Sequence, residues 1–206
     1  IFDFDGTLVH SEAAITQYFE SITKKLAPHR LDVAKNVLIG PPLRQTVAEI
    51  LGDPEHPLID EFVSAFIRMH DDDVLHHTTA YPSVHETLAS LHQQGEKMAI
   101  ATNKRLAPTV KILQHFSWEK FFLFVECSDG EALMRDKGQM IQTIQEKNSI
   151  FKDANFVGDT VGDAVGANSS STPFVKASYG YGKNQDWSGV AIHKDIKSFD
   201  ELLLLK

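Results

Sequence analysis

The sequence predicts an α/β protein in which an all-helical segment interrupts a mainly parallel sheet. Short apolar runs alternate with helical patterns over most of its 206 residues, which is typical of parallel strands joined by helices. Between residues 11 and 78 the alternation stops, and apolar residues recur at helical spacing instead. Acidic side chains also follow two of the expected strands. Together these observations predict a Rossmann-like core with an insertion after its first strand and a polar site at the sheet edge.

The expected strands of this core are short and apolar. They lie at Ile1–Phe4, Lys97–Thr102, Phe122–Glu126, Asn155–Gly158, Pro173–Lys176 and Val190–His193. Amphipathic spacing predicts the intervening helices. These helices are expected at Ser83–Gln94, Pro108–Phe116, Lys137–Asn148 and Thr160–Ser169.

The inserted segment divides the chain into two expected domains. Residues 1–10 and 79–206 form the α/β core domain, and residues 11–78 form the helical domain. Pro28, Gly40-Pro41-Pro42 and Gly52-Asp53-Pro54 separate the helices of the second domain. The alternative is one irregular α/β domain.

Composition narrows the class of partner. The formal net charge is −8, and charges of both signs are spread along the chain, so neither nucleic acid nor an anionic membrane is favoured. The late apolar run Leu202–Leu205 is too short to span a bilayer. The start of the sequence does not resemble a signal peptide, because the acidic residues Asp3 and Asp5 interrupt it. A single cysteine, Cys127, excludes an intrachain disulfide and fits a cytoplasmic setting. The oligomeric state is not indicated.

Two pairs of acids carry the first chemical signal. Asp3 and Asp5 lie on the same side of an extended strand, and Asp159 and Asp163 lie about one turn apart where a helix is expected to start. Single acids there are explained by turns or helix caps. Four carboxylates at the carboxyl ends of two strands are better explained by a bound cation, and all-oxygen ligands suit Mg²⁺.

Two further segments contribute polar groups. Thr102 and Asn103 end an expected strand before a helix, where a hydroxyl and backbone amides can bind phosphate oxygens; an ordinary N-cap is the alternative. Lys137 begins a helix and offers a fixed cation to a site crowded with acids; the alternative is a surface lysine.

In order, these segments resemble the four motifs of the haloacid dehalogenase superfamily, and the chain is similar to its phosphoglycolate phosphatase branch. The run Asp3-Phe4-Asp5-Gly6-Thr7-Leu8 resembles the first motif, Thr102 the second, Lys137 the third, and Gly158-Asp159-Thr160 with Asp163 the fourth. The segments Ala80-Tyr81-Pro82-Ser83 and Tyr179-Gly180-Tyr181-Gly182 extend the similarity. The helical insertion is then the family's small cap.

The resemblance implies a Mg²⁺-dependent phosphatase acting on a small phosphorylated metabolite. Asp3 is implied as the nucleophile that forms an aspartyl phosphate, and Asp5 as the acid and base for the leaving group and water. The metal ligands would be Asp3, the Asp5 carbonyl and Asp159, with Asp163 acting through water. Thr102, Asn103 and Lys137 would hold the phosphoryl oxygens.

The resemblance leaves several assignments open. Arg44, in the loop Gly40-Pro41-Pro42-Leu43-Arg44, is either a substrate contact or a solvated helix residue. His10 is either a substrate contact or an exposed loop residue. His70 with Asp71–Asp73, and His76-His77, suggest a second metal site or, more simply, a solvated helix end. A phosphosugar mutase and a non-catalytic phosphate-binding regulatory module remain the alternatives to a phosphatase.

Overall fold

A parallel sheet forms the centre of the computed structural model, which describes residues 1–129 and 135–205. Phe2 joins the two halves of this sheet because it bridges Ile100 on one side and Val157 on the other, both in parallel. The mainly parallel sheet expected from the sequence is confirmed. Across the sheet the order is β4 (Phe122–Cys127), β3 (Met98–Thr102), the chain at Phe2, β5 (Phe156–Gly158), β6 (Phe174–Ala177) and β7 (Lys194–Ile196).

Two of the expected strands differ from the sequence prediction. The run Ile1–Phe4 pairs as a strand only at Phe2, because the Phe4 carbonyl accepts hydrogen bonds from the Leu8 and Val9 amides and the chain turns out of the sheet. The strand expected at Val190–His193 is wrong in position. The structure instead has β7 at Lys194–Ile196, an edge strand whose charged residues face solvent and gave no apolar signal.

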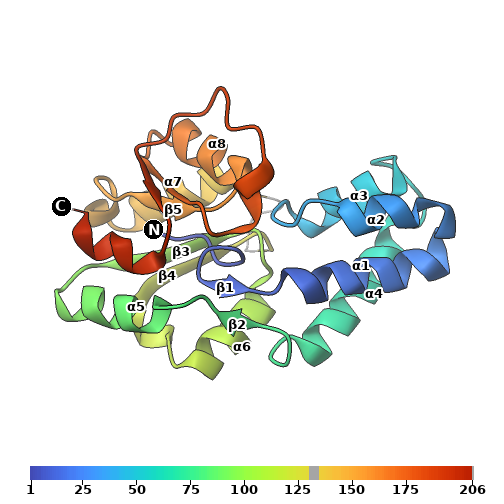
Figure 1. Cartoon of the computed structure of the whole chain (residues 1–206), viewed down its shortest axis with the longest axis horizontal. Helices are drawn as coiled ribbons and strands as arrows, with labels where there is room; N and C mark the ends of the chain where they lie inside the picture. The colour runs from blue at the N-terminus through green and yellow to red at the C-terminus, as the bar shows by residue number, and fades with distance from the viewer. Residues whose placement is uncertain (130–134, 206) are drawn as a thin grey trace.

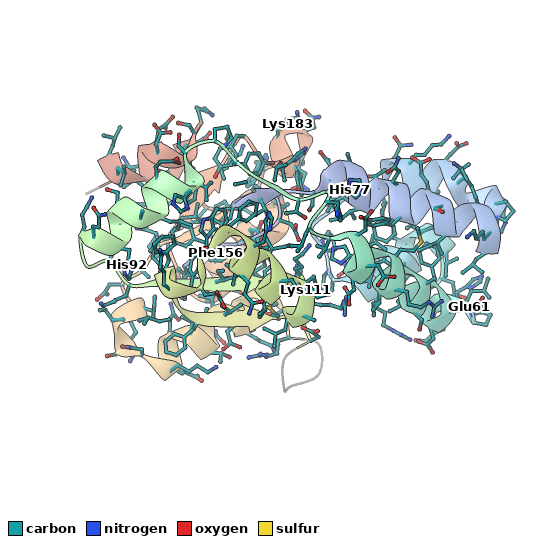
Figure 2. The ribbon with its side chains drawn as sticks, turned by 90° about the horizontal axis from the view of Figure 1, so that it is seen from below. Glu61, His77, His92, Lys111, Phe156 and Lys183 are labelled. Carbon is teal, nitrogen blue, oxygen red and sulfur yellow. The ribbon has the colours of Figure 1, made fainter. Side chains whose placement is uncertain are left out.

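Helices cover both faces of the sheet. One face carries α5 (Val84–Gln93) and α6 (Leu106–Phe116), and the other carries α7 (Lys137–Lys147) and α8 (Val161–Ser169) (Figure 1). Successive strand residues point to opposite faces, so Ile100 packs in the first apolar core and Ala99 and Ala101 in the second. Phe156, labelled in Figure 2, is fully buried in the second core.

A group of helices lies to one side of the sheet (Figure 1), and in the sequence it falls between two short strands. These strands, β1 (Val9–His10) and β2 (Thr79–Ala80), pair antiparallel, so the chain enters and leaves the helical segment side by side. The helices have an apolar core of their own, which includes Phe19, Val47, Ile50, Phe62 and Phe66. They are α1 (Glu12–Leu26), α2 (Leu31–Asn36), α3 (Leu43–Leu51) and α4 (Ile59–Asp73).

Short 3₁₀ helices complete the described chain, at Pro28–Arg30, Glu119–Phe121, Ser149–Phe151, Tyr181–Asn184 and Phe199–Leu204. Within residues 1–129 and 135–205, none of the helices combines the length and the apolar character needed to cross a membrane.

Candidate active site

The first acidic pair lies where the central chain leaves the sheet. The Asp3 amide still donates to the Val157 carbonyl of β5, at 2.8 Å. Gly6 then turns the chain with a φ of 87°, a conformation that a side chain would strain. A Cβ at this position would also collide with the carboxylate of Asp159. Glycine at position 6 therefore lets the turn after Phe4 lie directly against the end of β5.

Three buried carboxylates meet at this edge of the sheet. Asp3, Asp159 and Asp163 each offer one oxygen, and these oxygens all lie within 4.8 Å of one another. Their residues are 6%, 1% and 2% exposed, respectively. The structure thus brings together three of the four acids that the sequence singled out, while the side chain of Asp5 lies outside the cluster.

Asp163 combines the two roles that sequence reasoning treated as alternatives. Its Oδ2 accepts hydrogen bonds from the amides of Thr160 at 2.9 Å and Asp159 at 3.2 Å, which closes a capping box at the start of α8. Its Oδ1 lies 2.9 Å from the Lys137 ammonium. The helix cap therefore fixes one carboxylate oxygen and directs the other into the cluster.

Lys137 is the cation within this cluster. It begins α7, whose N-cap is a capping box between Asp136 and Gln139. The Lys137 Nζ lies 2.5 Å from Asp3 Oδ1 and donates to the Ala101 carbonyl at 3.1 Å. Lys137 is 6% exposed, so the interpretation of a surface lysine is wrong.

The charges of the cluster are unbalanced. Burial, and next the charge of Asp163, raise the pKa of Asp3 to about 7 even though Lys137 opposes the shift. Burial followed by the charges of Asp163 and Asp3 raises the pKa of Asp159 well above its ordinary value. Burial alone would lower the pKa of Lys137, but the charges of Asp163 and Asp3 raise it. One ammonium does not neutralise three carboxylates, so this set of oxygen donors fits a further hard cation such as Mg²⁺.

The late loop Tyr179–Gly182 packs against the cluster and binds one of its carboxylates. The Tyr181 amide donates to Asp159 Oδ2 at 2.7 Å, and Thr7 donates its hydroxyl to Asp159 Oδ1 at 3.0 Å. A Cβ on Gly182 would collide with the Asp159 carbonyl. The sequence pointed to this loop only by resemblance, and it gave no sign that the loop's backbone holds an acid.

The second motif lies beside Asp3 at the end of β3. The buried Thr102 accepts a hydrogen bond from the Lys104 amide through Oγ1, at 3.1 Å. Asn103 donates its side-chain amide to the Gly40 carbonyl of the helical segment at 2.8 Å. Its Oδ1 is buried and accepts no hydrogen bond from the described residues. Asn103 thus connects the core to the loop that carries Gly40.

Lys104 is a site residue that sequence reasoning missed. Its Nζ lies 3.0 and 3.2 Å from the two carboxylate oxygens of Asp5, and 3.2 Å from His70 Nε2. Ser11 also donates its hydroxyl to Asp5, at 2.6 Å. The only available signal was the place of Lys104 directly after Thr102 and Asn103, at the edge where the acids were expected.

His70 corrects the interpretation of its segment as a solvated helix end. It is 5% exposed and its ring stacks on Phe66. An ammonium only donates hydrogen bonds, so His70 Nε2 accepts from Lys104 and the ring is neutral. Burial, and next the charge of Lys104, lower the pKa of His70 to about 4. His76 and His77 do face solvent beside Asp73, and among the described residues only the cluster of Asp3, Asp159 and Asp163 has the spacing of a metal site.

Other contacts join the helical segment to the core. Asp71 on α4 pairs with Arg105. Lys111 on α6, labelled in Figure 2, donates to the Asp71 carbonyl at 3.1 Å. The core and the helical segment therefore meet through charged contacts around α4.

A pocket lies between the sheet edge and the helical segment. Its polar end contains Asp3, Asp5, Thr102, Asn103 and Lys104. The rest of its lining consists of the apolar side chains Ile15, Phe19, Ile39, Pro41, Leu43, Phe66 and Pro108, together with Gly40, Thr46, His70 and Arg105.

Arg44 and His10 are not brought into this pocket. Arg44 lies on α3 with its side chain half exposed, and its Nη1 lies 2.6 Å from Asp60. Its neighbour Leu43 lines the pocket instead. His10 is exposed and lies against the rings of Tyr81 and Tyr181. The buried cluster, in contrast, gathers residues that are far apart in the chain.

The family model of haloacid dehalogenase-like hydrolases matches residues 1–177. The chain belongs to this family. A phosphoglycolate phosphatase from Rhodobacter capsulatus is 30% identical, over 89% of this chain and 85% of its own. A 5′-nucleotidase from Pseudomonas aeruginosa is 23% identical, over 90% of this chain and 85% of its own. The resemblance seen in the sequence is confirmed.

The fold of this hydrolase agrees with solved structures. A predicted phosphoglycolate phosphatase from Haemophilus somnus superposes with a TM-score of 0.84, at 22% identity, and the match covers 98% of this chain and 95% of the other. The α/β fold class is therefore confirmed, as is the expected class of enzyme, a phosphoric monoester hydrolase.

Proposed function

We propose that this hydrolase is a Mg²⁺-dependent phosphatase that cleaves a small phosphomonoester through an aspartyl phosphate on Asp3. The observation that carries the proposal is the buried cluster of Asp3, Asp159 and Asp163 around Lys137. It combines one carboxylate at the pocket with a fixed cation and a set of metal-binding oxygens. A phosphate ester needs all three, because its hydrolysis depends on placement and charge neutralisation.

In the first step, one carboxylate oxygen of Asp3 attacks phosphorus and the bond from phosphorus to the ester oxygen breaks. Lys137, at 2.5 Å from Asp3, holds this carboxylate in position and offsets the negative charge of the phosphoryl oxygens. Thr102 and Asn103 lie at the same edge of the pocket, where the Thr102 hydroxyl and the backbone amide of Asn103 contact the phosphoryl group.

Asp5 acts as the general acid and then as the general base. It gives a proton to the departing alkoxide, and it then takes one from the water that attacks the aspartyl phosphate. This second attack releases inorganic phosphate and regenerates the Asp3 carboxylate. Lys104 and Ser11 both contact the Asp5 carboxylate and so fix its orientation toward the pocket.

Mg²⁺ is the cation that best suits the oxygen donors of the cluster. Asp3, Asp159 and the Asp5 carbonyl would hold it, with Asp163 in support. When bound, it supplies positive charge that offsets the phosphate dianion and the surplus of carboxylates.

The helical segment, residues 11–78, acts in this proposal as a cap domain that covers the pocket and contacts the leaving group. Its support is the pairing of β1 with β2, which connects the segment to the core at one place, and the apolar wall that the segment contributes to the pocket. A cover of this kind excludes water that would otherwise compete for the phosphoryl group.

The test is phosphate release from a panel of small phosphomonoesters with Mg²⁺, with EDTA, and with the Asp3→Asn variant. We expect EDTA to abolish release, and Asp3→Asn to lower kcat by about 10⁴-fold or more, since nucleophile removal has effects of this size. Asp153→Asn, which changes an exposed acid in the same way, should keep full activity. An Asp3→Asn variant as active as the parent chain, or a folded and Mg²⁺-loaded protein that releases no phosphate from any ester, would refute the proposal.

A further inference from the structure

The pocket has a charged end and an uncharged end, and the reacting phosphate occupies the charged one. Asp3 and Asp5 mark the charged end. The leaving group must then extend toward the helical segment, where Ile15, Phe19 and Phe66 contribute apolar side chains. The chemistry of this uncharged end decides which alcohols fit.

Every cation that lines the pocket within the described residues is already paired with a protein carboxylate. Lys104 is paired with Asp5, and Arg105 is paired with Asp71. The Lys104 side chain is only 4% exposed. If it turned to a ligand it would leave the half-buried Asp5 carboxylate with only the Ser11 hydroxyl and no charged partner, which is costly. His70 adds no charge, because its ring is neutral.

Arg44, the cation that the sequence suggested for a carboxylate or sugar, lies outside the pocket. Its guanidinium is held by Asp60 at 2.6 Å, on the exposed side of α3. Leu43 takes its place in the pocket wall. An anionic leaving group therefore finds no free cation among the described residues of the uncharged end.

Asn103, a residue of the pocket lining, has one buried polar atom that accepts no hydrogen bond from the described residues. Asn103 uses its amide N–H for the Gly40 carbonyl, and its Oδ1 is without a hydrogen-bond partner in the described chain. A carbonyl oxygen of this kind accepts a hydrogen bond from a hydroxyl or amine, and it repels a carboxylate. Because this oxygen is itself buried, it offers an anionic leaving group no binding site.

We propose that the enzyme is selective for phosphomonoesters of uncharged alcohols with an apolar surface, and that it discriminates against esters whose alcohol carries a carboxylate or a second phosphate. This inference rests on the proposed phosphatase function and narrows its substrate class. A nucleoside monophosphate satisfies it. Phosphoglycolate does not, because its carboxylate would lie beside the ester oxygen in the pocket, where Lys104 and Arg105 are already paired with protein carboxylates.

The experiment compares kcat/KM for benzyl phosphate and 4-carboxybenzyl phosphate with the full-length, Mg²⁺-loaded protein. The two esters share the same leaving oxygen and ring, and they differ by one carboxylate that must enter the apolar end. Phosphoglycolate and a nucleoside 5′-monophosphate are measured alongside. We expect benzyl phosphate and the nucleotide to exceed both carboxylates by at least about tenfold, as an unpaired buried charge is disfavoured by this much or more.

A charge-introducing variant tests whether the apolar wall causes the selectivity. Leu43→Lys places an ammonium in the wall, whereas Gln45→Lys adds the same charge to an exposed position of the same helix. Leu43→Lys should reduce the preference for benzyl over 4-carboxybenzyl phosphate by about tenfold. Gln45→Lys should leave the ratio within about twofold of the parent value.

The outcomes separate the inference from the proposed function. If the carboxylates are hydrolysed as efficiently as benzyl phosphate, the selectivity is refuted while the phosphatase stands. If Leu43→Lys and Gln45→Lys change the ratio equally, the pocket wall is not its cause and the inference falls. If none of the four esters releases phosphate, the phosphatase proposal itself fails.

Discussion

The sheet edge and the helical segment face each other across one pocket, and their interiors are opposite in kind. The sheet edge buries four charged groups, Asp3, Lys137, Asp159 and Asp163. The helical segment buries aromatic and aliphatic side chains such as Phe19 and Phe66. Buried charge is costly unless it is paired or bound to a ligand. The acid cluster at the sheet edge is therefore expected to destabilise the metal-free fold. The helical side buries no cluster of charges of this kind, and in the proposed function its apolar residues contact the leaving group.

After the loss of the nucleophile Asp3, the largest expected effect comes from removing the cation of the sheet edge. Lys137→Met leaves three buried carboxylates without an ammonium, so we expect kcat to fall by about 10²–10³-fold. Breaking a buried ion pair should also lower the free energy of unfolding by about 3–5 kcal/mol. Phosphate release and chemical denaturation measure the two effects.

Lys147→Met is the matched control for this change. Lys147 lies at the other end of α7, with a half-exposed side chain paired to Glu126. Its loss should leave kcat within about twofold, because Glu126 lies outside the acid cluster and keeps its ion pair with Arg135, at 2.8 Å. Equal losses of activity in the two variants would show that the site does not depend on the buried position of Lys137.

The acid cluster should also give the metal-free protein an unusual pH dependence. Burial raises the pKa of Asp3 from 3.8 to about 7, so between these values the folded state binds more protons than the unfolded state. The contribution of Asp3 to stability is therefore fully present below about pH 3.8 and is lost as the pH rises through about 7, by an amount on the order of a few kcal/mol. Mg²⁺ binds the ionised carboxylates and should restore Tm at pH 8 far more than at pH 5.

Thermal unfolding at each pH, with EDTA and with Mg²⁺, measures this effect. The lowered pKa of His70 acts in the opposite direction, since stability from a neutral histidine is lost as the pH falls from about 6.5 to about 4. This contribution is common to both conditions, so the difference between the two curves isolates the cluster. A stabilisation by Mg²⁺ that is equal at pH 5 and pH 8 would contradict the expected proton–metal competition.

A moderate effect is expected from the loop that braces Asp159. Gly182→Ala would place a Cβ against the Asp159 carbonyl, and displacing this backbone should cost about 1–3 kcal/mol. Activity should fall with it, because the Tyr181 amide that binds Asp159 lies in the same loop. In Gly162→Ala the new Cβ would be 3.6 Å from Thr160, which is ordinary contact, so this control should keep both stability and activity.

The smallest effect is expected on the outer face of the helical segment. Arg44→Ala removes an exposed ion pair with Asp60, which should change stability by less than about 1 kcal/mol. Its kcat/KM for each ester should equal that of the parent chain. A loss above about tenfold would place Arg44 in contact with substrate, and the comparison of an apolar helical side with a charged core would then need revision.

The parallel sheet and the acids at its edge could be predicted from the sequence, because strand periodicity and acid spacing are local signals. Strand order was not needed to predict that Asp3 and Asp159 meet, since the carboxyl ends of parallel strands share one edge. Lys104 and His70 escaped because their roles depend on a contact between the core and α4 that no local pattern encodes. Arg44 lies outside the pocket for a geometric reason: one step along a helix turns a side chain by about 100°, so Leu43 faces the pocket and Arg44 does not.

The pairing of β1 with β2 has a consequence for how such an enzyme diversifies. Val9 pairs with Ala80 and His10 with Thr79, so the two junctions of the helical segment lie one strand spacing apart, about 4.8 Å. Segments of different length or sequence can be grafted at these junctions without altering the register of the parallel sheet. The catalytic residues of the sheet edge can thus stay unchanged while the helical segment that lines the pocket changes.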